Sequence, residues 1–142
     1  MSTQALAAKV IARVLNGASL SQAFELCQES KDRARIRAIC YGVMREHDRL
    51  QGVLAQLLER PLKKKETMVL SLLLVGLFQL MSMDMPDYAA IFETVSAVKT
   101  IKKLRQKPWV KGFINGVLRR FQRDAKVLLC QANDQEAAFF SH

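Results

Sequence analysis

The stretch TMVLSLLLVGLFQLMSM, from Thr67 to Met83, is the most apolar part of the sequence. It is long enough for about four and a half turns of α-helix. On a helical wheel, apolar side chains cover nearly three sides of this helix. Its polar side chains share one narrow face: Thr67, Ser71, Gln79 and Ser82. Such a helix has to be surrounded by other apolar groups.

A lipid bilayer and a protein core are the two environments that could surround it. A membrane span needs about 20 apolar residues. The stretch is shorter, carries four polar side chains and stands alone in the chain. These features favour the central helix of a helical bundle, with no membrane partner. Gly76, in its middle, predicts that another helix crosses it closely.

Helix signals follow one another along the chain, and no stretch alternates as a strand would. We therefore expect an all-α bundle of about seven to nine helices around Thr67–Met83. We expect a break near His47 and a helix from Asp87 to about Ile101. We expect a basic loop over 102–107, an amphipathic helix from Pro108, and two short helices over 124–131 and 134–140.

Three details of these helices lead to further expectations. Glu93 shares a helix face with alanines, so its carboxylate needs a hydrogen-bonded partner, for which Arg45 or Asn115 is suitable. A structural role for Glu93 is favoured over a catalytic one, because no second titratable group accompanies it. Gly112 and Gly116 each cost helix stability, about 1 kcal/mol relative to Ala. Their spacing predicts close approach of another helix, or else of a phosphate backbone.

The composition suits one domain over residues 1–142. Lys9 and Arg13 interrupt the apolar positions of the N-terminus, which is unlike a secretory signal, so we expect a cytoplasmic protein. The cysteines are widely spaced and form no CxxC motif, which favours buried reduced thiols over disulfides or zinc ligands: Cys27, Cys40 and Cys130.

Motifs of catalysis and cofactor binding are absent from the sequence. The six glycines never fall as GxG, and no Ser/His/Asp set or paired-carboxylate site is apparent. His47 and His142 are isolated and are more typical of surface residues than of metal ligands. We expect no catalytic residue, cofactor or metal in this chain, which alone would not be an enzyme.

The positive charge is concentrated in one segment. Between Lys99 and Lys126 the sequence holds ten basic residues and one acid, Asp124. The excess in this segment equals the net charge of +9 of the whole chain. One-sided charge of this kind indicates a polyanionic partner.

Five motifs in order resemble the NusB fold: CYGVMR at 40–45, RPLKKK at 60–65, VGLFQL at 75–80, PDYAAIFETV at 86–95 and GFINGVLRRF at 112–121. More narrowly, they resemble the NusB-like N-terminal domain of the Sun/Fmu family of 16S ribosomal RNA cytosine-C5 methyltransferases. The resemblance implies an RNA-binding accessory domain excised from a longer protein, whose catalytic domain would follow His142. That domain would use S-adenosylmethionine and a pair of cysteines, one of them in a Pro-Cys dipeptide that this chain lacks.

On this reading the partners are ribosomal RNA and the parent protein's own catalytic domain, and the chain is a monomer or weak dimer. Trp109 either packs as a core or staple residue at a helix start, as Trp more often does, or stacks on a base. We predict phosphate contacts for eight side chains: Lys102, Lys103, Arg105, Lys107, Lys111, Arg119, Arg120 and Arg123.

Two other functions fit the same sequence. The basic face could dock on an acidic protein surface, so that the domain is an interaction module. The chain could also be a standalone antitermination factor of the NusB type, which shares the Asn-Gly-Val element found here at 115–117.

Overall fold

The computed structural model describes the backbone of residues 1–140 and the side chains of residues 1–133. Within residues 1–140 it has eight α-helices and no strand, which confirms the all-α fold. The helices are α1 (Thr3–Leu15), α2 (Leu20–Ala23), α3 (Arg33–Arg45), α4 (His47–Leu57), α5 (Thr67–Ser82), α6 (Asp87–Ala97), α7 (Lys102–Arg105) and α8 (Pro108–Phe140). Short 3-10 turns occupy Phe24–Cys27, Lys64–Glu66 and Val98–Thr100.

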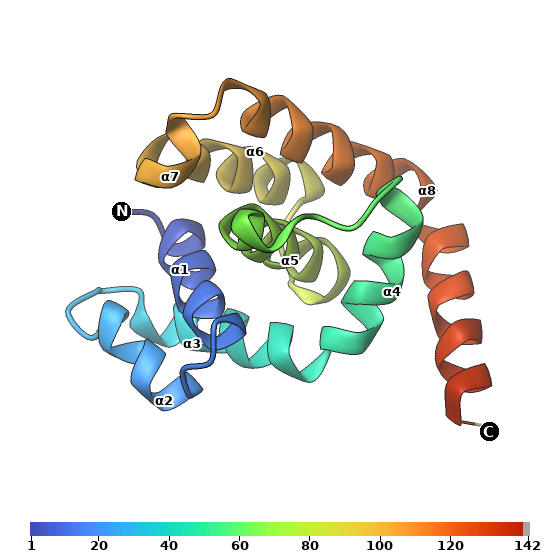
Figure 1. Ribbon diagram of the computed structural model, residues 1–142, viewed down its shortest axis with the longest axis horizontal. Helices are drawn as coiled ribbons and strands as arrows, with labels where there is room; N and C mark the ends of the chain where they lie inside the picture. The colour runs from blue at the N-terminus through green and yellow to red at the C-terminus, as the bar shows by residue number, and fades with distance from the viewer. Residues whose placement is uncertain (141–142) are drawn as a thin grey trace.

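α5 is the central helix, as predicted. Figure 1 shows it in the middle of the molecule, with α6 and α8 on one side and α1 and α3 on the other. Every residue from Ser71 to Gln79 is buried. By length and composition alone, the segment Lys64–Ser82 could cross a membrane. In the structure it is the core against which α1, α3, α6 and α8 pack.

Hydrogen bonds satisfy the polar side chains that α5 carries into this core. The Gln79 Nε2 group donates to the Thr94 hydroxyl at 2.9 Å, and the Gln4 Nε2 group donates to Gln79 Oε1 at 3.0 Å. The Gln4 amide also donates to Glu93 Oε2 at 2.8 Å. This network joins α1, α5 and α6, because its four members come from those three helices.

The partner of Glu93 is therefore Gln4. The sequence-based expectation of Arg45 or Asn115 was wrong, since Arg45 is exposed and forms an ion pair with the neighbouring Glu46, and Asn115 accepts a hydrogen bond from Arg119. The expected structural role of the carboxylate agrees with this network.

Two glycines permit close helix crossings. A Cβ atom on Gly76 would lie 2.9 Å from Leu118 Cδ1 and 3.0 Å from Thr94 Cγ2, which confirms the predicted close crossing. A Cβ atom on Gly42 would overlap the ring of Phe78, so α3 also needs glycine where it crosses α5. The opposite holds on α8, where a Cβ atom on Gly112 or Gly116 would meet nothing within 4 Å. The expected helix contact at these two positions was wrong.

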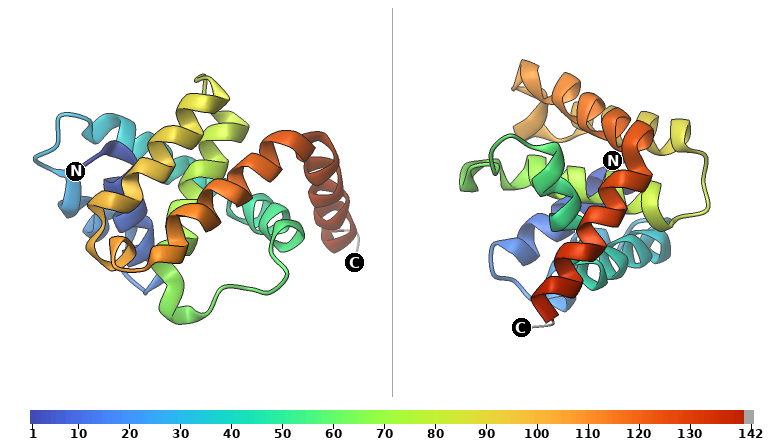
Figure 2. Two further views of the ribbon diagram at one scale, coloured as in Figure 1. Left: turned by 90° about the horizontal axis from the view of Figure 1, so that it is seen from above. Right: turned by 90° about the vertical axis from the view of Figure 1, so that its right-hand side faces the viewer.

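Several boundaries differ from the sequence-based expectations. The chain breaks before His47 as predicted, but α6 ends at Ala97 in a 3-10 turn, and the expected basic loop contains the short helix α7. α8 bends at Asp124, whose backbone is non-helical, and then continues as one helix to Phe140 rather than as two. After the bend it turns away and lies beside α4 (Figure 2), where the Gln56 side chain donates to the Leu128 carbonyl at 2.8 Å.

Two of the three cysteines are buried, as expected. Burial, together with the nearby Cys27, raises the pKa of the Cys40 thiol to about 12, so this thiol stays protonated near neutral pH. The expectation was wrong for Cys130, which is exposed because it lies on the outer side of α8 after the bend.

The glycine environments predict opposite effects of adding one methyl group. Gly42→Ala should lower the free energy of unfolding by about 1–3 kcal/mol, because the buried Phe78 ring has to move. Gly112→Ala should raise it by about 1 kcal/mol, because the position is open and helical. Urea denaturation of both variants measures the difference, and equal effects would contradict the packing described here.

Candidate nucleic-acid interface

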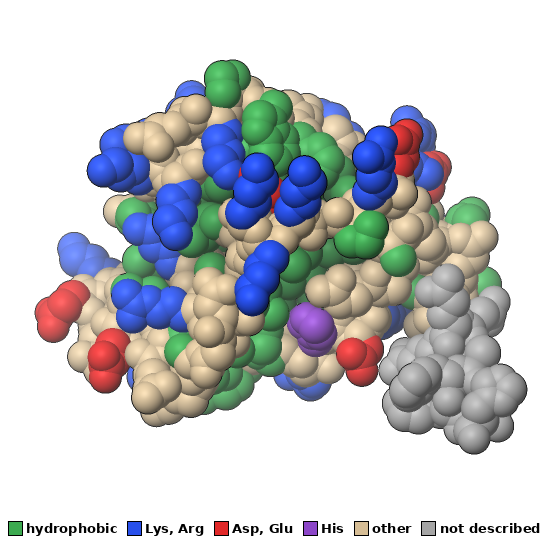
Figure 3. Space-filling view, in the orientation of Figure 1, with side chains coloured by type: hydrophobic (Ala, Val, Ile, Leu, Met, Phe, Trp, Pro, Cys, Tyr) green, Lys and Arg blue, Asp and Glu red, His purple; other side chains and the backbone are tan. Residues whose placement is uncertain are grey.

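Basic side chains gather over α7, the first part of α8 and the turn before α5. Figure 3 shows Lys and Arg side chains in a band that crosses one face of the molecule, from α7 to the bend of α8. Seven of the eight predicted phosphate contacts are solvent-exposed: Lys102, Lys103, Arg105, Lys111, Arg119, Arg120 and Arg123. The lysines at 63–65 are exposed as well.

Lys107 differs from the other seven because it forms an ion pair with a carboxylate, that of Glu66. Its Nζ atom lies 2.8 Å from Glu66 Oε1 and 2.7 Å from Oε2. Glu66 is only 9% exposed and directly precedes α5. The pair therefore joins the start of α8 to the start of the central helix, and the Lys107 charge is already neutralised.

The arginines of α8 are exposed, and their contacts within the domain are weaker. Arg120 donates to the carbonyl of Leu57, at the end of α4, at 3.3 Å. Arg120 and Arg123 both lie within ion-pair distance of Asp124, at 4.0 Å and 3.4 Å. Arg119 donates to the Asn115 side chain at 3.1 Å. Exposed ion pairs of this kind contribute at most about 1 kcal/mol to stability, so another anion can replace the partner of the arginine.

The lysines and the arginine of α7, and Lys111 of α8, have no acidic partner among the described side chains. Among the residues whose side chains are described, no ion pair involves Lys102, Lys103, Arg105 or Lys111. Their charges are available to a ligand.

Trp109 is at the surface rather than in the core. It is 46% exposed and its ring packs edge-to-face on Phe113, with 5.6 Å between ring centroids. Gly112, Gly116 and Arg119 follow it at helical spacing on the same exposed face of α8. This face therefore offers bare backbone between an aromatic ring and a guanidinium group, which leaves the phosphate-backbone explanation of the two glycines open.

Two basic residues that the sequence analysis did not choose lie beside this surface. Lys9 and Arg13 of α1 line a groove together with Lys102 and Lys103 of α7. No local pattern could have found them, because α1 and α7 are far apart in the sequence.

An exposed aromatic pair was also missed. Tyr88 and Phe92 are 76% and 70% exposed, one turn apart on α6. Their spacing was a usable signal, because they fall on the side of the helix away from the buried Ala90 and Thr94.

The described side chains include no group of three His, Cys, Asp or Glu residues that could hold a metal ion. His47 is half-buried beside Gln51, with 3.4 Å between the ring Nε2 atom and the amide nitrogen. His142 lies outside the described residues.

The Lys107–Glu66 contact predicts a structural role for this lysine. Lys107→Met should lower the free energy of unfolding by about 1–3 kcal/mol, because it leaves the nearly buried Glu66 carboxylate without its partner. Lys111→Met is the matched control and should change stability by less than about 0.5 kcal/mol, because Lys111 is exposed. Thermal or urea denaturation separates the two, and equal stability would show that the ion pair contributes nothing.

Comparison with known proteins places this geometry in a family. The NusB family profile matches residues 1–123. The chain is 38% identical over 140 residues to ribosomal RNA small subunit methyltransferase B of Proteus mirabilis, and 38% identical over 146 residues to the protein of that name from Vibrio cholerae. A third relative of the same name, from Sodalis glossinidius, is 41% identical over 135 residues. These alignments cover 96%, 100% and 92% of this chain but only 32%, 33% and 30% of the relatives, so the chain spans about a third of their length. The chain belongs to the NusB family.

Proposed function

We propose that this chain is an RNA-binding accessory domain of an S-adenosylmethionine-dependent 16S ribosomal RNA (cytosine-C5) methyltransferase that acts in the cytoplasm. It holds RNA phosphates and helps to position the substrate for a catalytic domain outside this chain. The names of the relatives support the parent activity, and the fraction of their length that aligns supports an accessory role. The observation that carries the proposal is the band of exposed basic side chains over α7 and α8, whose charges are free or only weakly paired.

Lysine and arginine contacts with phosphate supply affinity that does not depend on base sequence. The free or weakly paired cations are the first contacts: Lys102, Lys103, Arg105, Lys111 and Arg119. Arg120 and Arg123 can join them by exchanging Asp124 for phosphate. Lys107 is not included among these phosphate contacts, because its charge is paired with Glu66.

The salt dependence of RNA binding tests this proposal. Five phosphate contacts with single-stranded RNA should give a slope of log K against log salt of about −3.5. Lys111→Gln with Arg119→Gln should reduce the slope by about 1.4, because two contacts are lost. The matched control removes two charges from α3, on the other side of α5 (Figure 1), by Arg33→Gln with Arg45→Gln.

Fluorescence anisotropy with a 16S ribosomal RNA fragment measures both slopes. The control pair should keep the wild-type slope. A flat salt dependence of the wild-type protein, or equal losses in the two double variants, would contradict the proposal.

A second function is favoured by the aromatic pair on α6. Exposed aromatic side chains are typical of protein–protein contacts, because they bury much apolar area when covered. The occupant that we propose is the catalytic domain of a parent protein, because this chain matches only about a third of its relatives' length. The domain would then dock on its own catalytic domain through Tyr88 and Phe92 while α7 and α8 face RNA. The three relatives named above are all methyltransferases, which favours this arrangement over a standalone antitermination factor.

Co-elution of the domain with the separately produced remainder of the parent protein tests the docking surface. Tyr88→Ser with Phe92→Ser should abolish co-elution and leave the salt slope of RNA binding unchanged. Tyr41→Ser is the control, because Tyr41 is an exposed aromatic residue on a different helix, α3. Loss of co-elution in the control, or its survival in the double variant, would exclude this surface.

A further inference from the structure

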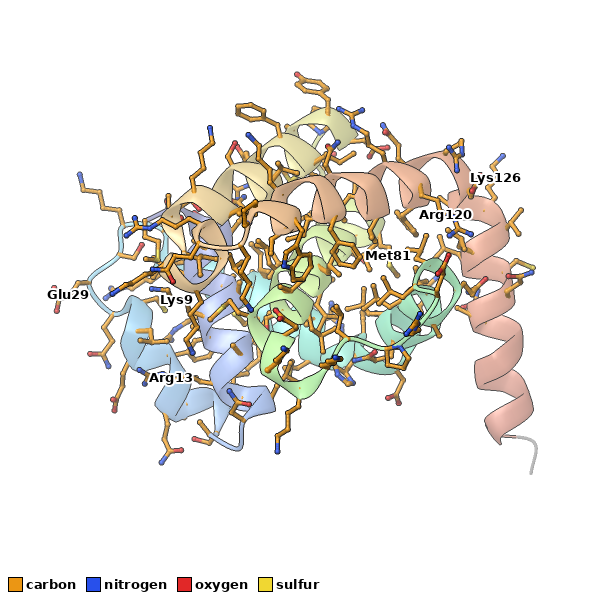
Figure 4. The ribbon with its side chains drawn as sticks, turned by 45° about the horizontal axis from the view of Figure 1, so that its top comes forward. Lys9, Arg13, Glu29, Met81, Arg120 and Lys126 are labelled. Carbon is orange, nitrogen blue, oxygen red and sulfur yellow. The ribbon has the colours of Figure 1, made fainter. Side chains whose placement is uncertain are left out.

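The groove between α1 and α7 has a cationic rim. Lys9 and Arg13 contribute from α1, and Lys102 and Lys103 contribute from α7. Figure 4 shows Lys9 and Arg13 at the end of the molecule opposite to Lys126. Within the part of the chain whose side chains are described, none of the four forms an ion pair with an acid. Four neighbouring like charges repel one another, so an anion between them would be favourable.

The floor of this groove is apolar, unlike its rim. Leu26 and Met68 line it as half-buried side chains, with the buried Ile101 beside them. The cavity volume is about 480 Å³, within the range of about 300–1,000 Å³ that is typical of small-ligand pockets. A bare anion would leave the apolar floor in contact with water, so the groove suits a ligand that combines a negative charge with an apolar part.

A nucleotide has this combination, because its base presents apolar faces and its phosphates are charged. In duplex RNA the base faces are stacked and unavailable, whereas single-stranded segments can splay a base onto a protein surface. The groove is also continuous with the basic surface of α7, since Lys102 and Lys103 belong to both. A strand that follows α8 and α7 would thus arrive at the groove.

We propose that the α1–α7 groove binds one unstacked nucleotide of single-stranded RNA. The base lies on Leu26 and Met68, and the adjoining phosphates lie between the cations of α1 and those of α7. This inference rests on the proposed RNA-binding function and deepens it, because it names the class of RNA and adds Lys9 and Arg13 to the contact surface.

Methionine methyl NMR of the whole chain tests base contact directly. The protein, labelled with 13C at its methionine methyl groups, is titrated with a short single-stranded RNA, with an abasic strand of the same length, and with inorganic phosphate. The ring current of a base should shift the Met68 methyl resonance with the base-containing strand only. The other methionines, including Met44 and Met85, serve as internal controls.

The charge contribution is tested in parallel. Lys9→Gln with Arg13→Gln should reduce the salt slope by about 1.4, because two single-strand phosphate contacts are lost. Arg45→Gln with Lys126→Gln removes the same charge away from the groove and should leave the Met68 shift unchanged. The thermal unfolding midpoints of the variants check that each one folds.

The outcomes separate this inference from the proposed function. If RNA binds with the expected salt slope but Met68 does not shift and Lys9→Gln with Arg13→Gln has no effect, the groove proposal is overturned and the RNA-binding function stands. An equal Met68 shift with the abasic strand or with phosphate also overturns it, because the site would then hold an anion only. If the wild-type protein shows no salt-dependent RNA binding, both fail.

Discussion

The enclosure of α5 is the constraint on which the rest of the structure depends. Leucines at 72, 73, 74 and 77 are fully buried, and each contributes about 1.5–3 kcal/mol of hydrophobic stabilisation. α3, α6 and α8 cross α5 closely at positions that require glycine, Gly42 on α3 and Gly76 on α5. Gln79, inside the same core, has to be hydrogen-bonded, and its partners on α1 and α6 fix how those two helices lie on α5.

The distribution of charge follows from this enclosure. A helix that covers α5 has one apolar face to bury, so its charged residues are directed to solvent. On α8 the buried face comprises Val110, Ile114 and Leu118, which leaves Lys111 and Arg119 outside. The short α7 is anchored by buried Leu104, with lysines and an arginine around it. The basic surface is therefore a consequence of how two amphipathic segments cover one apolar helix.

The sequence was sufficient for features that local pattern determines. The apolar stretch predicted α5, and the charge distribution located the basic surface. The predicted break near His47 and the predicted helix start at Pro108 were also correct. Features set by contacts between distant segments were not predictable, because no local pattern encodes which side chains meet. The Glu93–Gln4 bond, the Lys107–Glu66 pair and the approach of α1 to α7 belong to this second group.

The Lys107–Glu66 pair also bears on how well the basic surface can bind. It ties the junction of α7 and α8 to the turn that begins α5, so the cations are attached to the most deeply buried helix of the domain. A rigid arrangement loses less conformational entropy when a ligand binds than a flexible basic loop would. One lysine withdrawn from phosphate contact thus holds its neighbours in place. Phosphate contacts orient an RNA strand without reading its sequence, whereas selectivity for a base requires a surface that touches the base itself.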